Sequence, residues 1–221
     1  MSLPSSLLGP VRRLTTAARH GWGPTRLADH AIRRHQAVQR LPELAGLVSM
    51  VAALKPNVVV EVGTRHGGTF SCWPTVAADG ALLVSMDLPA GSFGGGSGDP
   101  VLARLAEFLR PGQRLETLRQ DSHLPASREW LVGVLAGRPI DFLFLDGDHS
   151  LAGIRQDFET YGPLVRKGGL VAFHDILPDP GNAHIQVPEF WAELRGRYDA
   201  REFIDPPGRT SGGMGIGVVR V

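Results

Sequence analysis

Two short apolar runs, each followed by acidic residues and a histidine, constrain the fold of this chain more than any other feature. Residues 142–145 lead into Asp146, Asp148 and His149, and residues 170–173 lead into His174 and Asp175. Neither run alternates apolar and polar residues as a half-exposed strand would, so both are predicted to be buried strands of a parallel sheet. Ligands of such sheets bind beyond the carboxyl ends of the strands, where the acids and histidines of both runs would meet.

Strand-like and helix-like segments alternate through most of the chain. The strand candidates are residues 58–62, 81–86, 114–118, 142–145, 170–173, 200–204 and 215–221. The helix candidates are residues 69–78, 101–109, 127–135, 151–164 and 187–197. This alternation predicts a doubly wound, Rossmann-like α/β fold with a seven-stranded, mostly parallel sheet.

The first 54 residues precede this alternation and are predicted to form an N-terminal arm and helical extension, followed by the sheet domain in residues 55–221. Residues 1–24 are rich in Ser, Pro, Gly and Arg, whereas residues 25–50 are mostly compatible with a helix and residues 44–54 are a further helix candidate. The candidate buried positions of the extension are Leu27, Ile32, Val38 and Leu41. Lys55-Pro-Asn57 ends this region.

Composition favours a globular protein that meets neither nucleic acid nor a membrane. The formal net charge is +1 and 43% of the residues are hydrophobic, so no strong field attracts a polyanion. No apolar stretch approaches the ~20 residues that a membrane-spanning helix needs, and no secretory signal is expected. The single cysteine, Cys72, cannot form an intrachain disulfide, and a cytoplasmic location is the default expectation.

A glycine-containing loop follows the first strand candidate, in the sequence Glu61-Val-Gly-Thr-Arg-His-Gly-Gly-Thr69. Glycines let the backbone approach a ligand, and the start of the next helix presents unpaired N–H groups. The spacing departs from the dinucleotide fingerprint G-x-G-x-x-G and lacks the Gly-Lys-Ser/Thr of a phosphate loop. Asp87 ends the next strand candidate, where a carboxylate can accept hydrogen bonds from both ribose hydroxyls. A tight strand-to-helix turn explains the glycines alone, but it does not explain an acid at successive strand ends.

Taken together, these motifs resemble the class I S-adenosylmethionine-dependent methyltransferases. The nearest likeness is to the small-molecule O-methyltransferase branch, related to cephalosporin-hydroxylase-like and macrolide-sugar methyltransferases. The resemblance extends over roughly residues 40–221 and rests on the order and spacing of the motifs. It implies S-adenosylmethionine as cofactor, with Asp121 and Ser122 near the adenine. The cofactor-binding residues that it implies are Glu61, Gly63, Thr64, Gly67, Asp87, Asp121, Ser122 and Asp146.

The resemblance also implies a divalent metal ion held by Asp146, His174 and Asp175. His174 stands where the sugar-methylating members commonly carry an acid. Magnesium prefers oxygen ligands, whereas imidazole favours softer ions such as Mn²⁺ or Zn²⁺. Three arrangements stay open: Asp146 and Asp175 hold Mg²⁺ without His174, a softer ion such as Mn²⁺ binds, or no ion binds.

His149 is the candidate catalytic base, because an imidazole with a pKa of about 6.5 can take a hydroxyl proton near neutral pH. The competing interpretation is that His149 caps the helix predicted to begin near Leu151. The expected function is O-methylation of a hydroxylated small molecule, such as a sugar, another natural product or a catechol-like compound. Two alternatives are an auxiliary protein that binds the cofactor without catalysis and a nicotinamide-dependent oxidoreductase. The N-terminal helices would also allow a homo-oligomer.

Overall fold

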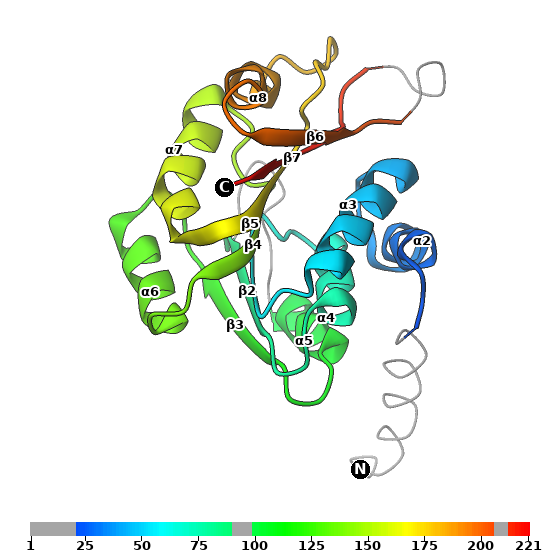
Figure 1. Cartoon of the computed structure of the whole chain (residues 1–221), viewed down its shortest axis with the longest axis vertical. Coiled ribbons are helices and arrows are strands. Elements are labelled where there is room, and N and C mark those ends of the chain that lie inside the picture. Colours follow the sequence, from blue (N-terminus) through cyan, green and yellow to red (C-terminus); the bar gives the residue numbers. More distant parts are fainter. Residues whose placement is uncertain (1–20, 90–98, 206–211) are drawn as a thin grey trace.

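The chain folds into a seven-stranded sheet with helices on both faces (Figure 1). The structure is a computed structural model that describes residues 21–89, 99–205 and 212–221. The strands are β1 (Val58–Val62), β2 (Leu82–Asp87), β3 (Arg114–Arg119), β4 (Ile140–Leu145), β5 (Val165–His174), β6 (Asp199–Phe203) and β7 (Ile216–Arg220). Their order in the sheet is β3-β2-β1-β4-β5-β7-β6. Strands β1 to β5 pair in parallel, whereas β7 is antiparallel to both β5 and β6. The predicted seven-stranded, mostly parallel Rossmann-like sheet is therefore confirmed.

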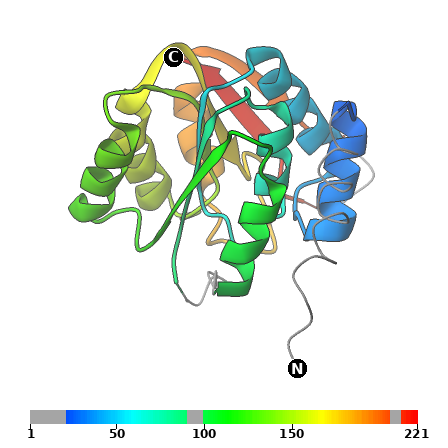
Figure 2. The ribbon, with the colours of Figure 1, turned by 90° about the horizontal axis from the view of Figure 1, so that it is seen from below.

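Helices cover both faces of the sheet, so the central strands β1 and β4 are buried and consist of apolar residues apart from Glu61 and Asp141. The helices are α2 (Pro24–His35), α3 (Leu41–Leu54), η2 (Thr69–Cys72), α4 (Trp73–Val76), α5 (Asp99–Phe108), α6 (Pro125–Leu135), α7 (Leu151–Tyr161), η3 (Gly162–Leu164) and α8 (Val187–Leu194). Helices α2 to α5 lie over one face and α6 to α8 over the other (Figures 1 and 2). Successive side chains of a strand point to opposite faces, so Val59 joins the first layer and Val60 the second.

The direction of the chain through the sheet reverses between β1 and β4, which are neighbours in the sheet. From β1 the chain proceeds outward to β2 and β3, and from β4 it proceeds the other way to β5. Loops on the two sides of such a switch point diverge and leave a crevice beyond the carboxyl ends of the strands. The motifs identified in the sequence all lie at this edge, which we call the rim: it comprises the residues that follow β1 to β5.

The N-terminal extension differs from the sequence-based prediction in one respect. Helix α2 ends at His35, where Gln36 adopts a left-handed conformation (φ 62°), and α3 begins only at Leu41. Residues 36–40 therefore cross between the two helices, and we call this segment the strap. Leu27 is buried as predicted, but Val38 is 49% exposed, so its predicted burial is wrong. The helical stripe that would have buried Val38 stops at Gln36.

The helices of the extension are packed into the same core as the sheet. Leu27 of α2 and Leu44 of α3 belong to the hydrophobic cluster that contains Val59 and Phe142. The division at residues 54 and 55 stays a prediction. The predicted arm up to residue 20 and the glycine-rich residues 90–98, which the sequence places between the second strand candidate and the next helix candidate, lie outside the described residues. Within the described ranges, no helix combines the length and apolar character that crossing a membrane would demand.

Candidate functional site

The glycine loop between β1 and η2 is shaped by close contact with the loop that follows β4. Gly63 adopts φ +87°, and a Cβ built there would lie 2.0 Å from the carbonyl oxygen of Asp146. Gly67 adopts φ +78°, and its Cβ would lie 2.4 Å from the Leu105 side chain. Only glycine combines a left-handed backbone with such close approach, so both positions are explained by packing as well as by a ligand.

The side chains of Glu61 and Thr64 lie beneath this loop. Glu61 is 1% exposed and accepts a hydrogen bond from Trp73 Nε1, while Thr64 Oγ1 accepts one from Ser85 Oγ. The pKa of Glu61 is raised to about 8, mainly by burial and also by the nearby carboxylates of Asp146 and Asp87, although the hydrogen bond from Trp73 opposes the shift. In this structure Glu61 and Thr64 support the loop from inside, and their predicted contact with a cofactor stays a prediction.

Asp87 lies at the end of β2 and fixes one side of the loop. Its Oδ2 accepts a hydrogen bond from the backbone N–H of Arg65 at 2.7 Å. Arg119, its register partner on β3, donates from Nη2 to Ser85 Oγ at 3.1 Å and so links the two strand ends. Burial lowers the pKa of Arg119, and the carboxylates of Asp87 and Glu61 oppose this effect. Sequence reasoning missed Arg119, which reads simply as a charged residue at the end of an edge strand.

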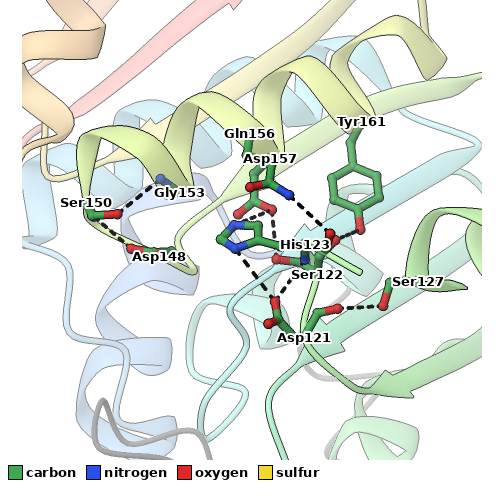
Figure 3. A network of polar contacts seen from close by, with 10 residues as sticks. All are labelled: Asp121, Ser122, His123, Ser127, Asp148, Ser150, Gly153, Gln156, Asp157 and Tyr161. Atoms are coloured by element: carbon green, nitrogen blue, oxygen red, sulfur yellow. Dashed lines mark hydrogen bonds and ion pairs between the residues drawn. The ribbon is translucent and has the colours of Figure 1, made fainter. Parts of the chain in front are cut away.

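Residues 121–123, after β3, are held by a network of polar contacts with α7 (Figure 3). Ser122 Oγ donates a 2.7 Å hydrogen bond to Asp157 Oδ1, and Tyr161 donates its hydroxyl proton to the Ser122 carbonyl. His123 Nε2 lies 3.4 Å from the same oxygen of Asp157. Asp121 is exposed at the surface of this loop. The structure therefore places Asp121 and Ser122 together, with Ser122 tied inward.

The buried carboxylate of Asp157 is the centre of this network. Asp157 is 1% exposed, and its interaction with His123 raises the pKa of that histidine to about 9, although burial works in the opposite direction. Sequence reasoning did not single out Asp157. The sequence does contain one signal: Asp157 lies next to the predicted buried stripe of Ile154, Phe158 and Tyr161, and a charged group near buried positions requires a partner.

Asp146, His149 and Asp175 form a cluster at the centre of the rim. Each offers a potential ligand atom, and these atoms all lie within 4.8 Å of one another. His149 Nδ1 is 2.8 Å from Asp175 Oδ2, and His149 Nε2 is 3.5 Å from Asp146 Oδ1. Burial lowers the pKa of His149, but the two carboxylates raise it by more, so the net shift is upward. Ser150 caps α7 by accepting from the N–H of Gly153, so His149 is not the helix cap.

His174 lies beside this cluster, although it is not one of the three grouped residues. Its Nδ1 is 3.2 Å from Asp146 Oδ1 and 3.3 Å from Asp175 Oδ2. Within the described part of the chain neither ring nitrogen finds a partner with hydrogen-bond geometry, so these contacts are ionic. Burial lowers the pKa of His174, but Asp146 and Asp175 raise it to about 10. The pKa of Asp175 is conversely held far below its ordinary range, because His149 and His174 outweigh its burial.

Gln39, from the strap, is the functional candidate that sequence reasoning missed most completely. Its side-chain amide donates from Nε2 to Asp146 Oδ2 at 2.9 Å and accepts at Oε1 from Thr69 Oγ1 at 2.6 Å. Gln39 is 5% exposed and lies 107 positions from Asp146 in the sequence. Nothing in the local sequence signals this contact, because a single glutamine between two helices is ordinarily a surface residue.

The rim thus combines a glycine loop, acids at the ends of successive strands and a histidine oriented by a carboxylate. Such a cluster can take up a proton from a bound hydroxyl group. The donor set of Asp146, His149 and Asp175, two carboxylates and one imidazole, also fits a divalent ion that accepts nitrogen and oxygen ligands, as Mn²⁺ does. It suits Mg²⁺ less well, since that ion prefers oxygen throughout.

Comparison with known proteins gives a family for this arrangement. Residues 60–176, more than half of the chain, match a family described as a methyltransferase domain. The uncharacterized protein y4gI of Sinorhizobium fredii (strain NBRC 101917 / NGR234) is 26% identical over 153 residues. That alignment covers 66% of this chain but only 16% of y4gI, so the chain spans a small part of this relative's length.

Solved structures share the whole fold at low sequence identity. An O-methyltransferase from Bacillus cereus, in complex with SAH, is 16% identical, with a TM-score of 0.56 over 100% of this chain and 93% of its own. The O-methyltransferase TomG from Streptomyces achromogenes, involved in tomaymycin synthesis and solved with SAM, is 16% identical, with a TM-score of 0.57 over 100% of both chains. These likenesses establish the fold, and the family match confirms the resemblance seen in the sequence. The chain belongs to the methyltransferase-domain family.

Proposed function

We propose that this chain is an S-adenosylmethionine-dependent O-methyltransferase that acts on a hydroxylated small molecule. One observation carries the proposal: the His149–Asp175 pair lies next to Asp146, whose backbone contacts the glycine loop at Gly63. A proton-accepting group and a loop suited to the cofactor therefore share one rim. S-adenosylmethionine would supply an electrophilic methyl group there. The family match and the two structural neighbours that hold SAH or SAM support this cofactor.

The residues of the rim divide between the parts of such a cofactor. Gly63 and Gly67 keep the backbone of the loop accessible, and Asp87 lies where a carboxylate can accept hydrogen bonds from ribose hydroxyls. Asp121 and Ser122 would face the adenine from the loop after β3. Asp146, at the end of β4, would lie at the amino-acid end, because its backbone contacts Gly63.

His149 would act as the base that takes the proton from the acceptor hydroxyl. Asp175 lies 2.8 Å from Nδ1, so a proton on Nδ1 is held by the carboxylate and Nε2 is left with its lone pair. Asp175 thereby sets the tautomer and the orientation of the ring, as a carboxylate behind a catalytic histidine generally does. Asp175 and His174 are themselves buried, so little water would reach them on this side of the site.

A divalent ion is a second element of the proposal. Asp146 and Asp175 would be its oxygen ligands, and His149 or His174 would be its nitrogen ligand. Bound there, it would lower the pKa of a hydroxyl group and orient it. His149 Nε2 cannot serve as ligand and base together, so if His149 is the base, the ion would be held by Asp146 and Asp175 either with the nitrogen of His174 or without a nitrogen ligand.

Isothermal titration of the full chain with S-adenosylhomocysteine, with and without Mn²⁺ or Mg²⁺, is the first test. Micromolar affinity is expected, and a gain with either ion would support the ion site. Labelled S-adenosylmethionine should then be used to screen sugars, catechols and other polyhydroxylated acceptors for methyl transfer. Absence of binding under every condition would remove the proposed function, and binding without transfer to any acceptor would favour an auxiliary protein.

Substitution of the base gives the sharpest test once an acceptor is found. His149→Gln should lower the rate by about 10²- to 10⁴-fold, the usual contribution of a general base, while S-adenosylhomocysteine affinity changes little. Unchanged turnover would show that His149 is not the base. Asp175→Asn should lower the rate in the same way, because the orientation of His149 depends on this carboxylate. A thermal-shift comparison with NAD checks the oxidoreductase alternative, since only a true ligand stabilises the fold.

A further inference from the structure

We infer that Gln39 of the strap is a positioning residue at the amino-acid end of the cofactor site, where it sets the orientation of Asp146. This inference rests on the proposed function, because it concerns the same rim. Gln39 lies outside residues 60–176, the part that matches the methyltransferase domain. The N-terminal extension would thus complete the site as well as cover the sheet.

The hydrogen bonds of Gln39 leave only one orientation for its amide. An ionised carboxylate only accepts hydrogen bonds, so the NH₂ group of Gln39 must face Asp146 Oδ2, 2.9 Å away. The carbonyl oxygen Oε1 must then accept from Thr69 Oγ1, at 2.6 Å. Thr69 begins η2 directly after the glycine loop. Gln39 therefore connects the cofactor loop to the acid that follows β4 through one buried side chain.

Backbone packing holds the strap in this position. A Cβ on Gly68 would lie 2.3 Å from the backbone nitrogen of Ala37 and 2.5 Å from its Cα, so the strap crosses in direct contact with the glycine loop. Ala37 is buried, and its backbone N–H donates to the Ala31 carbonyl at the end of α2. At the other end, the Arg40 guanidinium donates to the Gly212 carbonyl at 2.8 Å. Gln39 is thus carried by a segment fixed on both sides.

The consequence for Asp146 is a carboxylate whose two oxygens have different partners. Oδ2 is engaged by a neutral amide, whereas Oδ1 faces His174 Nδ1 at 3.2 Å and His149 Nε2 at 3.5 Å. Gln39 is an uncharged partner, so it fixes Oδ2 without adding to the positive charge that the two histidines bring to Oδ1. Such a carboxylate, next to a loop that approaches through Gly63, is suited to bind the ammonium of an amino acid by a charge-assisted hydrogen bond. Without Gln39, Oδ2 would lose its partner and the carboxylate would be held only through Oδ1 by the two histidines.

Two ligands separate this local role from general support of the fold. S-adenosylhomocysteine carries the amino-acid part, whereas 5′-methylthioadenosine has the same adenosine and thioether without it. Gln39→Met keeps a similar side-chain volume and removes both hydrogen bonds. In titrations of the full chain, this variant should lower the affinity for S-adenosylhomocysteine by about tenfold, the scale of one charge-assisted contact. The affinity for 5′-methylthioadenosine should fall by less than about threefold.

A second variant and a matched control complete the design. Gln39→Glu keeps the shape but replaces the amide NH₂ with oxygen, so two carboxylates would meet, and a larger selective loss of S-adenosylhomocysteine affinity is expected. Val38→Ala changes an exposed neighbour on the strap and should leave both affinities within about twofold. Melting temperatures of all variants report whether each one folds.

The outcomes are distinct. A loss of affinity for S-adenosylhomocysteine, without a matching loss for 5′-methylthioadenosine, in the Gln39 variants supports the positioning role. Equal weakening of both ligands, or affinities like those of the unsubstituted chain, overturns it and leaves the proposed function intact. If the unsubstituted chain itself binds no S-adenosylhomocysteine, the proposed function and this inference both fail.

Discussion

The two ends of the rim are built by different means. At the end that contains Gly63 and Asp146, backbone segments touch directly, and a single glutamine from the strap bridges the remaining polar groups. At the end that contains Ser122 and His123, the loop is held by side chains of α7 (Figure 3). The first end depends on the absence of side chains at glycine, and the second depends on one buried carboxylate, Asp157.

This difference separates two kinds of information in the sequence. Glycines that permit close approach lie within a short motif, so the first end is visible in the sequence apart from Gln39. The second end depends on contacts between residues 33 or more positions apart, such as Ser122 with Asp157 and Tyr161. Substitutions at the two ends should therefore differ in size and in the ligands that they affect.

The largest effect is expected from Gly63→Ala. The new Cβ would lie 2.0 Å from the Asp146 carbonyl oxygen, and the backbone would be strained at φ +87°, so the free energy of unfolding should fall by about 3 kcal/mol or more. Gly137→Ala is the matched control, because Gly137 has φ +80° but nothing within 4 Å of a built Cβ. It should cost only the backbone strain, about 1 kcal/mol. Urea unfolding of both variants measures the difference, and equal costs would contradict the close approach.

Asp157→Ala should have the next largest effect and act at the other end. It removes the buried acceptor of Ser122 Oγ and the ion-pair partner of His123, so the free energy of unfolding should fall by about 2 kcal/mol. Gln156→Ala, which removes an exposed contact to the His123 carbonyl, is the control and should cost less than about 1 kcal/mol. Both S-adenosylhomocysteine and 5′-methylthioadenosine should bind more weakly to Asp157→Ala. Weaker binding of only one of the two ligands would mean that the two ends of the rim are not separate.

Tyr161→Phe isolates one contact of the second end. The hydroxyl donates to the Ser122 carbonyl, and the rest of the ring is buried, so the variant loses one hydrogen bond and keeps its packing. The free energy of unfolding should fall by about 1 kcal/mol. Unfolding curves of the variant and the unsubstituted chain give this number, and a loss above about 3 kcal/mol would point to a rearranged loop.

His123→Gln should show the smallest effect and a dependence on pH. Asp157 raises the pKa of His123 to about 9 in the folded chain, against its ordinary value of 6.5. A raised pKa stabilises the fold fully below about pH 6.5, and the contribution disappears as the pH rises through about 9. His123 is partly exposed, so solvent screening limits the difference to about 1 kcal/mol or less.

Melting temperatures of His123→Gln and the unsubstituted chain should therefore differ most below pH 6.5 and converge above pH 9. The carboxylates of Asp121, Asp148 and Asp157 are the charged groups that act on His123. A difference that is constant across this range would show that packing, and not the ion pair, accounts for the effect.

The strands and the rim could be predicted because local patterns in the sequence indicate them. Apolar runs such as residues 58–62 and 142–145 have no polar face, and only burial on both sides satisfies them. A parallel sheet then brings the residues after each strand to one edge, so the meeting of Asp146, His149 and Asp175 follows from order along the chain. The family resemblance rests on the same order.

The strap, the Asp157 network and the exact neighbours of His174 could not be predicted in this way. Val38 and Gln39 change places relative to the expected pattern: the apolar residue is exposed and the polar one buried, because α2 stops at Gln36 and the chain turns across the glycine loop. The layered fold, and the strand ends that carry chemical groups, follow from hydrophobic periodicity and chain order, which act locally. The pairing of the buried polar atoms follows from the folded arrangement alone, since hydrogen bonds such as Gln39 to Asp146 join residues 107 positions apart and depend on distances that no local pattern encodes.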